Sequence, residues 1–286
     1  MSEVFDNRIC QLGEGPLWHP IRNQLFWFDI LEKKLLTRTG AVQQYWQFDE
    51  YVSAAGWVDE TTLLVASQTG LWRFDLETAE RDTIVALEAD NLMTRSNDGR
   101  ADPQGGFWIG TMGIEAEFHA GAIYRYFNGE LRKLVSNVSI PNAICFTPDG
   151  TTAFYTDTST RKIMTWSLDG VTGWPVGQPE LFLDMEHDGL NPDGAVVDGA
   201  GNLWVAQWGA GRVAAYSRDG TFLRSVVVAG QHSSCPAFGG SDLRTLFCTT
   251  ALQGVSDAEA AKEPHNGMTF AMSDVAQGQK EHKVLL

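Results

Sequence analysis

Six polar residues recur along the chain at intervals of 39 to 51 residues. They comprise two carboxylates, two carboxamides and two hydroxyls: Glu14, Ser53, Asn97, Asn142, Asp193 and Ser234. Oxygen donors without sulfur or imidazole suit a hard divalent cation, Ca²⁺ above all, although Mg²⁺, Mn²⁺ and Zn²⁺ also accept carboxylates. If these side chains met in space, the two negative charges would neutralise one such ion.

The residues that follow each of the six show that they occupy one structural phase. Four positions later stands an apolar residue, and six positions later a Pro, Asp or Gly that suits a turn. For any single position, a polar residue at the start of a strand more simply caps a turn or binds an ordered water. Two carboxylates facing each other are harder to explain in that way, because without an ion they repel and one becomes protonated.

The elements that must position these residues are short strands that end at turn residues and resume, with little helical periodicity between them. Six copies of this pattern start at the six polar residues, and their spacing is close to the roughly 40 to 50 residues of a four-stranded propeller blade. We therefore expect an all-β protein, a six-bladed β-propeller with four-stranded antiparallel blades, as one domain over residues 1–286. The innermost strands of a propeller line its channel, so the six polar residues should gather at one mouth.

The chain ends indicate how the ring closes. We predict that residues 2–10 add an outer strand to the blade built from roughly 234–286, whose own strands include 246–250 and 268–272. The segment 256–262 is the one helix-like stretch, and a short surface helix or loop is expected there.

Composition excludes several classes of function. The chain has 21 basic and 36 acidic residues, a net charge of −15, and no run of Lys or Arg, so nucleic-acid binding is not expected. No apolar stretch is long enough to span a bilayer and the N-terminus lacks a signal pattern, so we expect no membrane association, a cytoplasmic location and, by default, a monomer. The four cysteines form no metal-binding or disulfide pattern and are expected to be buried thiols. The histidines show no metal-binding spacing, and serine-hydrolase and phosphate-loop motifs are absent.

Five motifs in order resemble the gluconolactonase / regucalcin (senescence-marker-protein) family of six-bladed propellers. They are LGEGPLW from Leu12, RSNDGRADPQGGFWIGTM from Arg95, SIPNAICFTPDG from Ser139, NPDGAVVDGAGNLWVAQWGAGRV from Asn191 and CPAFGG from Cys235. The resemblance covers nearly the full chain.

The resemblance implies a functional site and a reaction. Three protein ligands of one divalent metal ion are implied at Glu14, Asn142 and Asp193, and substrate contacts at Arg95, Asn97 and Glu115. The implied substrate is a sugar lactone, such as a glucono-, xylono- or arabinonolactone, which is hydrolysed to the aldonic acid. The ion would polarise the carbonyl while Asp193 takes a proton from the attacking water. Trp208 either packs within a blade or lines the mouth.

Two alternatives remain open at this point. Propellers also serve as non-catalytic calcium-binding or protein-docking scaffolds, although the repeats lack the GH and WD signatures of the commonest docking propellers. A related propeller hydrolase could act on another ester or an organophosphate.

Overall fold

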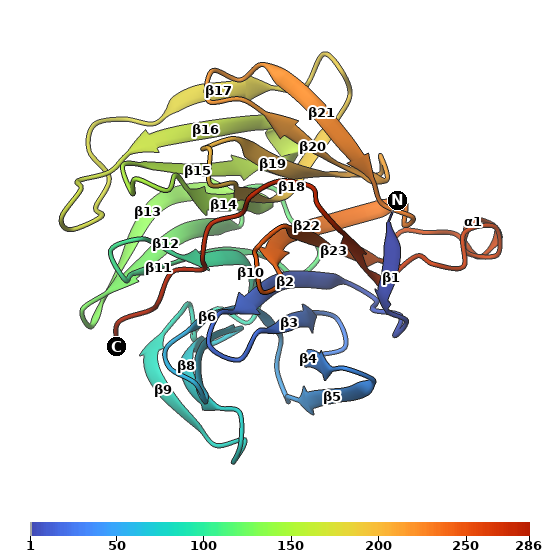
Figure 1. Ribbon diagram of the computed structural model, residues 1–286. Helices are drawn as coiled ribbons and strands as arrows, with labels where there is room; N and C mark the ends of the chain where they lie inside the picture. Colours follow the sequence, from blue (N-terminus) through green and yellow to red (C-terminus); the bar gives the residue numbers. More distant parts are fainter. Residues whose placement is uncertain (1) are drawn as a thin grey trace.

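The computed structural model describes residues 2–286, and within them the chain forms six four-stranded antiparallel sheets arranged as the blades of a ring (Figure 1). The predicted propeller is therefore confirmed; residue 1 of the predicted domain lies outside the described residues. In five blades the strands are consecutive. These are β2 (Gly13–His19), β3 (Gln24–Asp29), β4 (Lys34–Thr39) and β5 (Val42–Gln47) in blade 1; β6 (Val52–Trp57), β7 (Thr62–Ser67), β8 (Gly70–Asp75) and β9 (Arg81–Ala86) in blade 2; β10 (Thr94–Ala101), β11 (Phe107–Gly113), β12 (Gly121–Phe127) and β13 (Glu130–Val138) in blade 3; β14 (Pro141–Phe146), β15 (Thr152–Asp157), β16 (Lys162–Ser167) and β17 (Glu180–Asp184) in blade 4; and β18 (Asn191–Val197), β19 (Leu203–Trp208), β20 (Arg212–Tyr216) and β21 (Phe222–Val227) in blade 5.

Blade 6 joins the two ends of the chain. It contains β22 (His232–Gly239), β23 (Thr245–Ala251) and β24 (Thr269–Met272), and its outer strand is β1 (Glu3–Asp6), which pairs antiparallel with β24. The predicted closure by the N-terminal segment is confirmed. The two short helical elements are the 3₁₀ turn η1 (Thr158–Thr160) in blade 4 and α1 (Asp257–Ala260), which lies in the segment expected to hold a short helix or loop.

The inner strands β2, β6, β10, β14, β18 and β22 neighbour one another in turn and enclose the central channel. Their residues are almost entirely buried, as the channel position requires. The apolar core lies between adjacent blades, where aromatic and branched side chains of facing sheets pack together. All four cysteines are buried and unpaired, as predicted.

The last fourteen residues depart from expectation. The sequence pattern predicts that they belong to the final blade, but that blade's last ladder strand ends at Met272, and residues 273–286 run across one end of the channel (Figure 1). The side-chain amide of Gln279 donates to the carbonyls of Phe146 and Val197, at the ends of β14 and β18. Farther along the tail, the backbone N–H of Val284 donates to the backbone carbonyl of Trp57 at the end of β6. The tail therefore closes the mouth at which the inner strands end.

Membrane-spanning helices are not found among residues 2–286, because neither helical element has the length or apolar character to cross a bilayer.

Candidate active site at the open mouth of the channel

A cavity of about 390 Å³ lies at the other mouth, where the inner strands begin. Four of the six recurring polar residues line it: Glu14, Asn97, Asn142 and Asp193. The remaining two, Ser53 and Ser234, do not, which corrects the expectation that all six converge. The Ser53 hydroxyl donates to that of Ser96 at 2.8 Å, and the Ser234 hydroxyl donates to the Gly13 carbonyl. The two hydroxyls therefore join neighbouring inner strands and leave the cavity to carboxylates and carboxamides.

A bulge in each inner strand explains why these side chains turn into the channel. In all six inner strands the pairing register shifts at or directly after the recurring polar residue. A bulge re-aims a side chain and ends regular pairing. Gly15 and Ala143, which follow Glu14 and Asn142, both adopt the left-handed conformation, with φ of 54° and 55°. A Cβ at Gly15 would lie 2.2 Å from the Ser53 carbonyl oxygen, so only glycine fits there.

Glu14 and Asp193 share this cavity and are only 5% and 4% exposed. Burial, followed by the charge of Asp98, raises the pKa of Glu14 to about 8, although the Gly15 N–H and the Arg95 charge act in the opposite direction. Burial, followed by the charges of Glu14 and Asp98, raises the pKa of Asp193 well above its usual range. Neither carboxylate forms a salt bridge among the described residues. The cavity therefore holds two buried acidic groups that lack a paired base.

Arg95 is the one basic side chain lining the cavity within residues 2–286. Its guanidinium donates to the Ser96 carbonyl at 2.9 Å and to the Asn97 side-chain oxygen at 2.8 Å. Its Nε is buried without a partner. Burial lowers the pKa of Arg95 to about 10, so the group stays charged at neutral pH. The Nε–H of this guanidinium is thus a buried donor that no other described residue satisfies.

The other predicted site residues fall into two settings. Asn97 and Asn142 are buried and bonded to each other, Nδ2 of Asn97 donating to Oδ1 of Asn142 at 3.0 Å. Glu115 lies at the exposed rim, on the loop between β11 and β12, where its backbone N–H bonds to the Glu117 carboxylate. Trp208 lines the mouth and stacks on His232 with ring centroids 4.4 Å apart. The cavity is thus lined by all the metal-ligand and substrate-contact residues that the resemblance implies, of which Glu115 alone is exposed.

Several residues at the site were not identified from the sequence. Asp98 lies directly after Asn97 and accepts a bond at 2.8 Å from the Ile144 N–H, and its position inside the RSND motif could have indicated it. Thr158 belongs to no repeat phase, because it follows the second strand of blade 4, and no spacing signal points to it. An apolar wall completes the cavity: Leu12, Met112, Ile114 and Ile140.

The donor set fits a hard divalent cation. Neither histidine nor cysteine is among the described residues that line the cavity. Residues 2–286 also contain no cluster of three or more His, Cys, Asp or Glu side chains that could hold a metal ion by themselves. Two carboxylates plus the carboxamide oxygen of Asn142 are the kind of ligands that Ca²⁺ and similar ions prefer. A cation would also remove the repulsion between Glu14 and Asp193.

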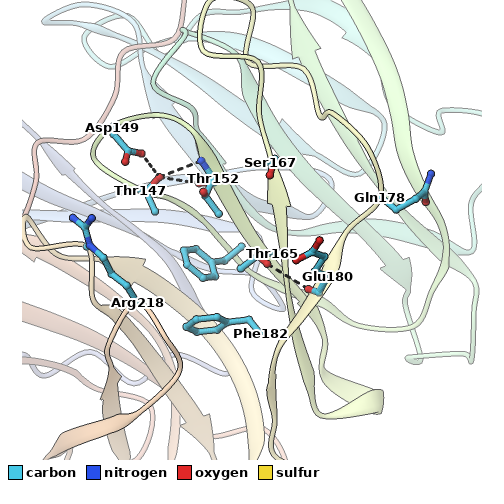
Figure 2. A pocket seen from close by; sticks show the side chains of 11 residues that line it. Thr147, Asp149, Thr152, Thr165, Ser167, Gln178, Glu180, Phe182 and Arg218 are labelled. Atoms are coloured by element: carbon cyan, nitrogen blue, oxygen red, sulfur yellow. Dashed lines mark hydrogen bonds between the residues drawn. The ribbon is translucent and has the colours of Figure 1, made fainter.

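A second groove also contains a carboxylate, but unlike those of the central cavity this carboxylate is exposed and hydrogen-bonded. It measures about 300 Å³ and lies between blades 4 and 5, where Thr147, Asp149 and Thr165 are among its polar side chains (Figure 2). Hydrogen bonds from Thr147 and Thr151 satisfy the exposed Asp149 carboxylate and lower its pKa. A turn carboxylate of this kind needs no cation, so the central cavity is the candidate site.

Known proteins share this sequence pattern and fold. Residues 12–252 match the SMP-30/Gluconolactonase/LRE-like region. A Rhizobium meliloti protein, provisionally named a sugar lactone lactonase, is 40% identical over 98% of this chain and 96% of its own. The L-arabinolactonase of Azospirillum brasilense is 34% identical over 91% and 87%. A crystal structure of the calcium-binding protein regucalcin from Agrobacterium tumefaciens covers 100% of this chain and 98% of its own, at 37% identity and a TM-score of 0.98. The chain belongs to the SMP-30/gluconolactonase/LRE-like family.

Proposed function

We propose that the protein is a hydrolase that opens a sugar lactone to its aldonic acid with the help of one divalent cation. The observation that carries this proposal is the pair of buried, unpaired carboxylates of Glu14 and Asp193 beside the Asn142 carboxamide in one open cavity. The relatives named as lactonases support the reaction class, and the neighbour described as calcium-binding supports the cation.

Glu14, Asn142 and Asp193 would hold the cation, which when bound supplies Lewis-acid polarisation of a carbonyl and of water. Ca²⁺ suits an all-oxygen set best, and Zn²⁺, Mg²⁺ and Mn²⁺ can also use it. Three protein ligands leave coordination positions for small molecules, as catalytic sites require.

Asp193 is the proposed general base. Burial and the charge of Glu14 raise its pKa in the metal-free protein. A bound cation would offset the Glu14 charge and favour the ionised form of Asp193, which can accept a proton. Asp193 takes a proton from the water whose oxygen bonds to the lactone carbonyl carbon. The ring C–O ester bond then breaks, and the same proton passes to the released hydroxyl oxygen. One water is consumed, and the product is the open-chain acid.

Arg95 and Asn97 orient the sugar. Arg95 supplies the one positive charge on the cavity wall among the described residues, and Arg95 and Asn97 hold each other through their 2.8 Å bond. The apolar wall and Trp208 suit the C–H faces of a sugar ring. A cavity of about 390 Å³ lies within the roughly 300–1,000 Å³ range of small-molecule sites. Glu115 at the rim is the third proposed contact and faces the part of the substrate that stays nearest solvent.

The test compares Asp193→Asn with wild type on a panel of pentono- and hexonolactones, using a pH indicator to follow acid release. We expect cation-dependent turnover in the wild type, loss on chelation, and a rate lower by about 10³-fold in the variant. Asp188→Asn, an exposed change five residues earlier, is the matched control and should leave the rate unchanged. Cation binding without turnover of any lactone would instead support a calcium-binding protein, and turnover that resists chelation would contradict the metal's role.

A further inference from the structure

Thr158 connects the strands that carry two of the proposed cation ligands. It opens η1 directly after β15, lines the cavity, and its backbone N–H donates to the Ile140 carbonyl at 2.9 Å. Its hydroxyl contacts both Asn142 in blade 4 and Pro192 in blade 5, the residue before Asp193. No other part of the side chain is polar, so these two bonds use the hydroxyl's donor and one of its acceptor sites.

The direction of these bonds can be determined from the end at blade 5. The Pro192 carbonyl can only accept, so the Thr158 hydroxyl must donate to it, at 2.7 Å. The same hydroxyl then has no second proton and must accept from the neighbouring carboxamide. Thr158 therefore selects the NH₂ group of Asn142 as its partner, at 2.9 Å, and turns the carboxamide oxygen the other way.

The opposite end of the same chain of bonds gives the same direction. The Arg95 guanidinium can only donate, so it faces Oδ1 of Asn97. The Asn97 NH₂ group then donates to the Pro141 carbonyl and to Oδ1 of Asn142, both at 3.0 Å. A donor-only group and an acceptor-only group thus terminate one chain of hydrogen bonds that allows a single orientation of the two carboxamides between them.

We propose that Thr158 is a positioning residue that holds the Asn142 carboxamide with its oxygen, not its nitrogen, directed at the cation. A carboxamide presents an acceptor on one side and two N–H donors on the other, and only the oxygen can bind a cation. One lone pair of the Asn142 oxygen accepts from Asn97, and the other remains for the ion. This inference rests on the proposed function, since it assigns Asn142 as a cation ligand.

The experiment measures Ca²⁺ affinity by titration calorimetry on metal-free protein, with the unfolding midpoint recorded for each variant. Thr158→Val keeps the shape but removes the hydroxyl, so the Asn142 NH₂ group loses its acceptor and the carboxamide is held from the Asn97 side alone. We expect an affinity lower by about tenfold, within the range for outer-sphere partners of ligands. Thr158→Ser retains the hydroxyl and should bind within about threefold of wild type. Thr160→Val makes the same change at an exposed position of η1 and should leave Ca²⁺ affinity unchanged.

A double-mutant cycle separates positioning from general support of the fold. Both oxygens of a carboxylate can bind a cation, so in an Asn142→Asp background the change Thr158→Val should no longer weaken Ca²⁺ binding. An equal loss in both backgrounds, or wild-type affinity in Thr158→Val, would overturn the positioning role while leaving the cation site intact. Absence of Ca²⁺ binding in the wild type would instead overturn the proposed function, and this inference with it.

Discussion

The two mouths of the central channel carry buried charge in opposite ways. At the open mouth, where the inner strands begin, Glu14 and Asp193 lie in one cavity without a salt bridge among residues 2–286. At the closed mouth, the C-terminal tail places Glu281 against Arg100 of β10 in a salt bridge whose side chains are 9% and 7% exposed. The same channel thus holds one compensated pair and one uncompensated pair.

This difference distinguishes a structural charge from a functional one. Burial lowers the pKa of Arg100, but Glu281 and other nearby acidic groups raise it overall, so Arg100 stays charged in the folded state. Burial instead raises the pKa of Glu14, and the charge of Asp98, another acid, raises it further. A protein retains such a cost where a ligand removes it, and the proposed divalent cation would do so here.

The largest effect on Ca²⁺ affinity is expected from a substitution of Glu14. Replacing Glu14 with Gln removes one of the two proposed charged ligands and should reduce Ca²⁺ affinity by more than about 100-fold, with a parallel loss of lactone turnover. The unfolding midpoint in chelator should not fall, because Gln matches the neutral form that the raised pKa favours for Glu14 in the metal-free protein. Calorimetric Ca²⁺ titration and thermal unfolding check the two parts, and a destabilised metal-free variant would contradict the contrast between the mouths.

A substitution at the closed mouth should have the opposite effect: it should lower the stability of the fold and leave Ca²⁺ affinity unchanged. Glu281→Gln leaves Arg100 buried without its partner charge, which costs about 3–5 kcal/mol of unfolding free energy. Urea unfolding measures this cost, while Ca²⁺ affinity should stay within about threefold of wild type. Lys280→Gln, an exposed change at the preceding position that breaks no salt bridge, serves as the control. A loss of Ca²⁺ affinity in Glu281→Gln larger than in the control would show that the two mouths are coupled.

The pH dependence of the metal-free protein gives a third test. The folded pKa of Glu14 is about 8 and its ordinary value is 4.5, so the folded state holds a proton that the unfolded state releases. The contribution of this group to stability is therefore fully present below about pH 4.5 and is lost as the pH rises through about 8. Unfolding midpoints recorded in chelator from pH 5 to 9 should decline, and excess Ca²⁺ should flatten that decline. Parallel curves with and without Ca²⁺ would contradict this account.

Much of the ring could be predicted from the sequence because each inner strand repeats the same order of polar start, apolar middle and turn. That repetition identified the positions of Glu14, Asn142 and Asp193 at one mouth, and the unassigned N-terminal residues identified the closing strand β1. Hydroxyl positions could not be assigned in this way. Ser53 and Ser234 share the phase of the ligands, but a hydroxyl is short enough to bond to the adjacent inner strand instead.

The features that could not be predicted from the sequence, Thr158 and the C-terminal tail, belong to no repeated pattern. Thr158 acts across two blades from a turn, so its role depends on the direction of hydrogen bonds that only coordinates provide. The tail over residues 273–286 has no strand alternation, and its contacts are with strand ends far away in the sequence, such as Phe146 and Trp57. Periodicity reports local structure, whereas these contacts follow from how the ring closes.

The smallest effect should come from the packing of the tail. Val284 is fully buried, and a Cβ on Gly56 would lie 2.4 Å from one of its methyl groups, so the two residues are in close contact. Val284→Ala removes two methyl groups from this closed mouth and should cost about 2 kcal/mol of unfolding free energy, measured by urea titration. Leu286→Ala at the exposed chain end should cost less than about 0.5 kcal/mol. Ca²⁺ affinity should not change in either variant, because the tail touches the ends of the inner strands and the proposed cation ligands stand at their beginnings. A change in Ca²⁺ affinity for Val284→Ala would mean that tail packing sets the geometry of the open mouth.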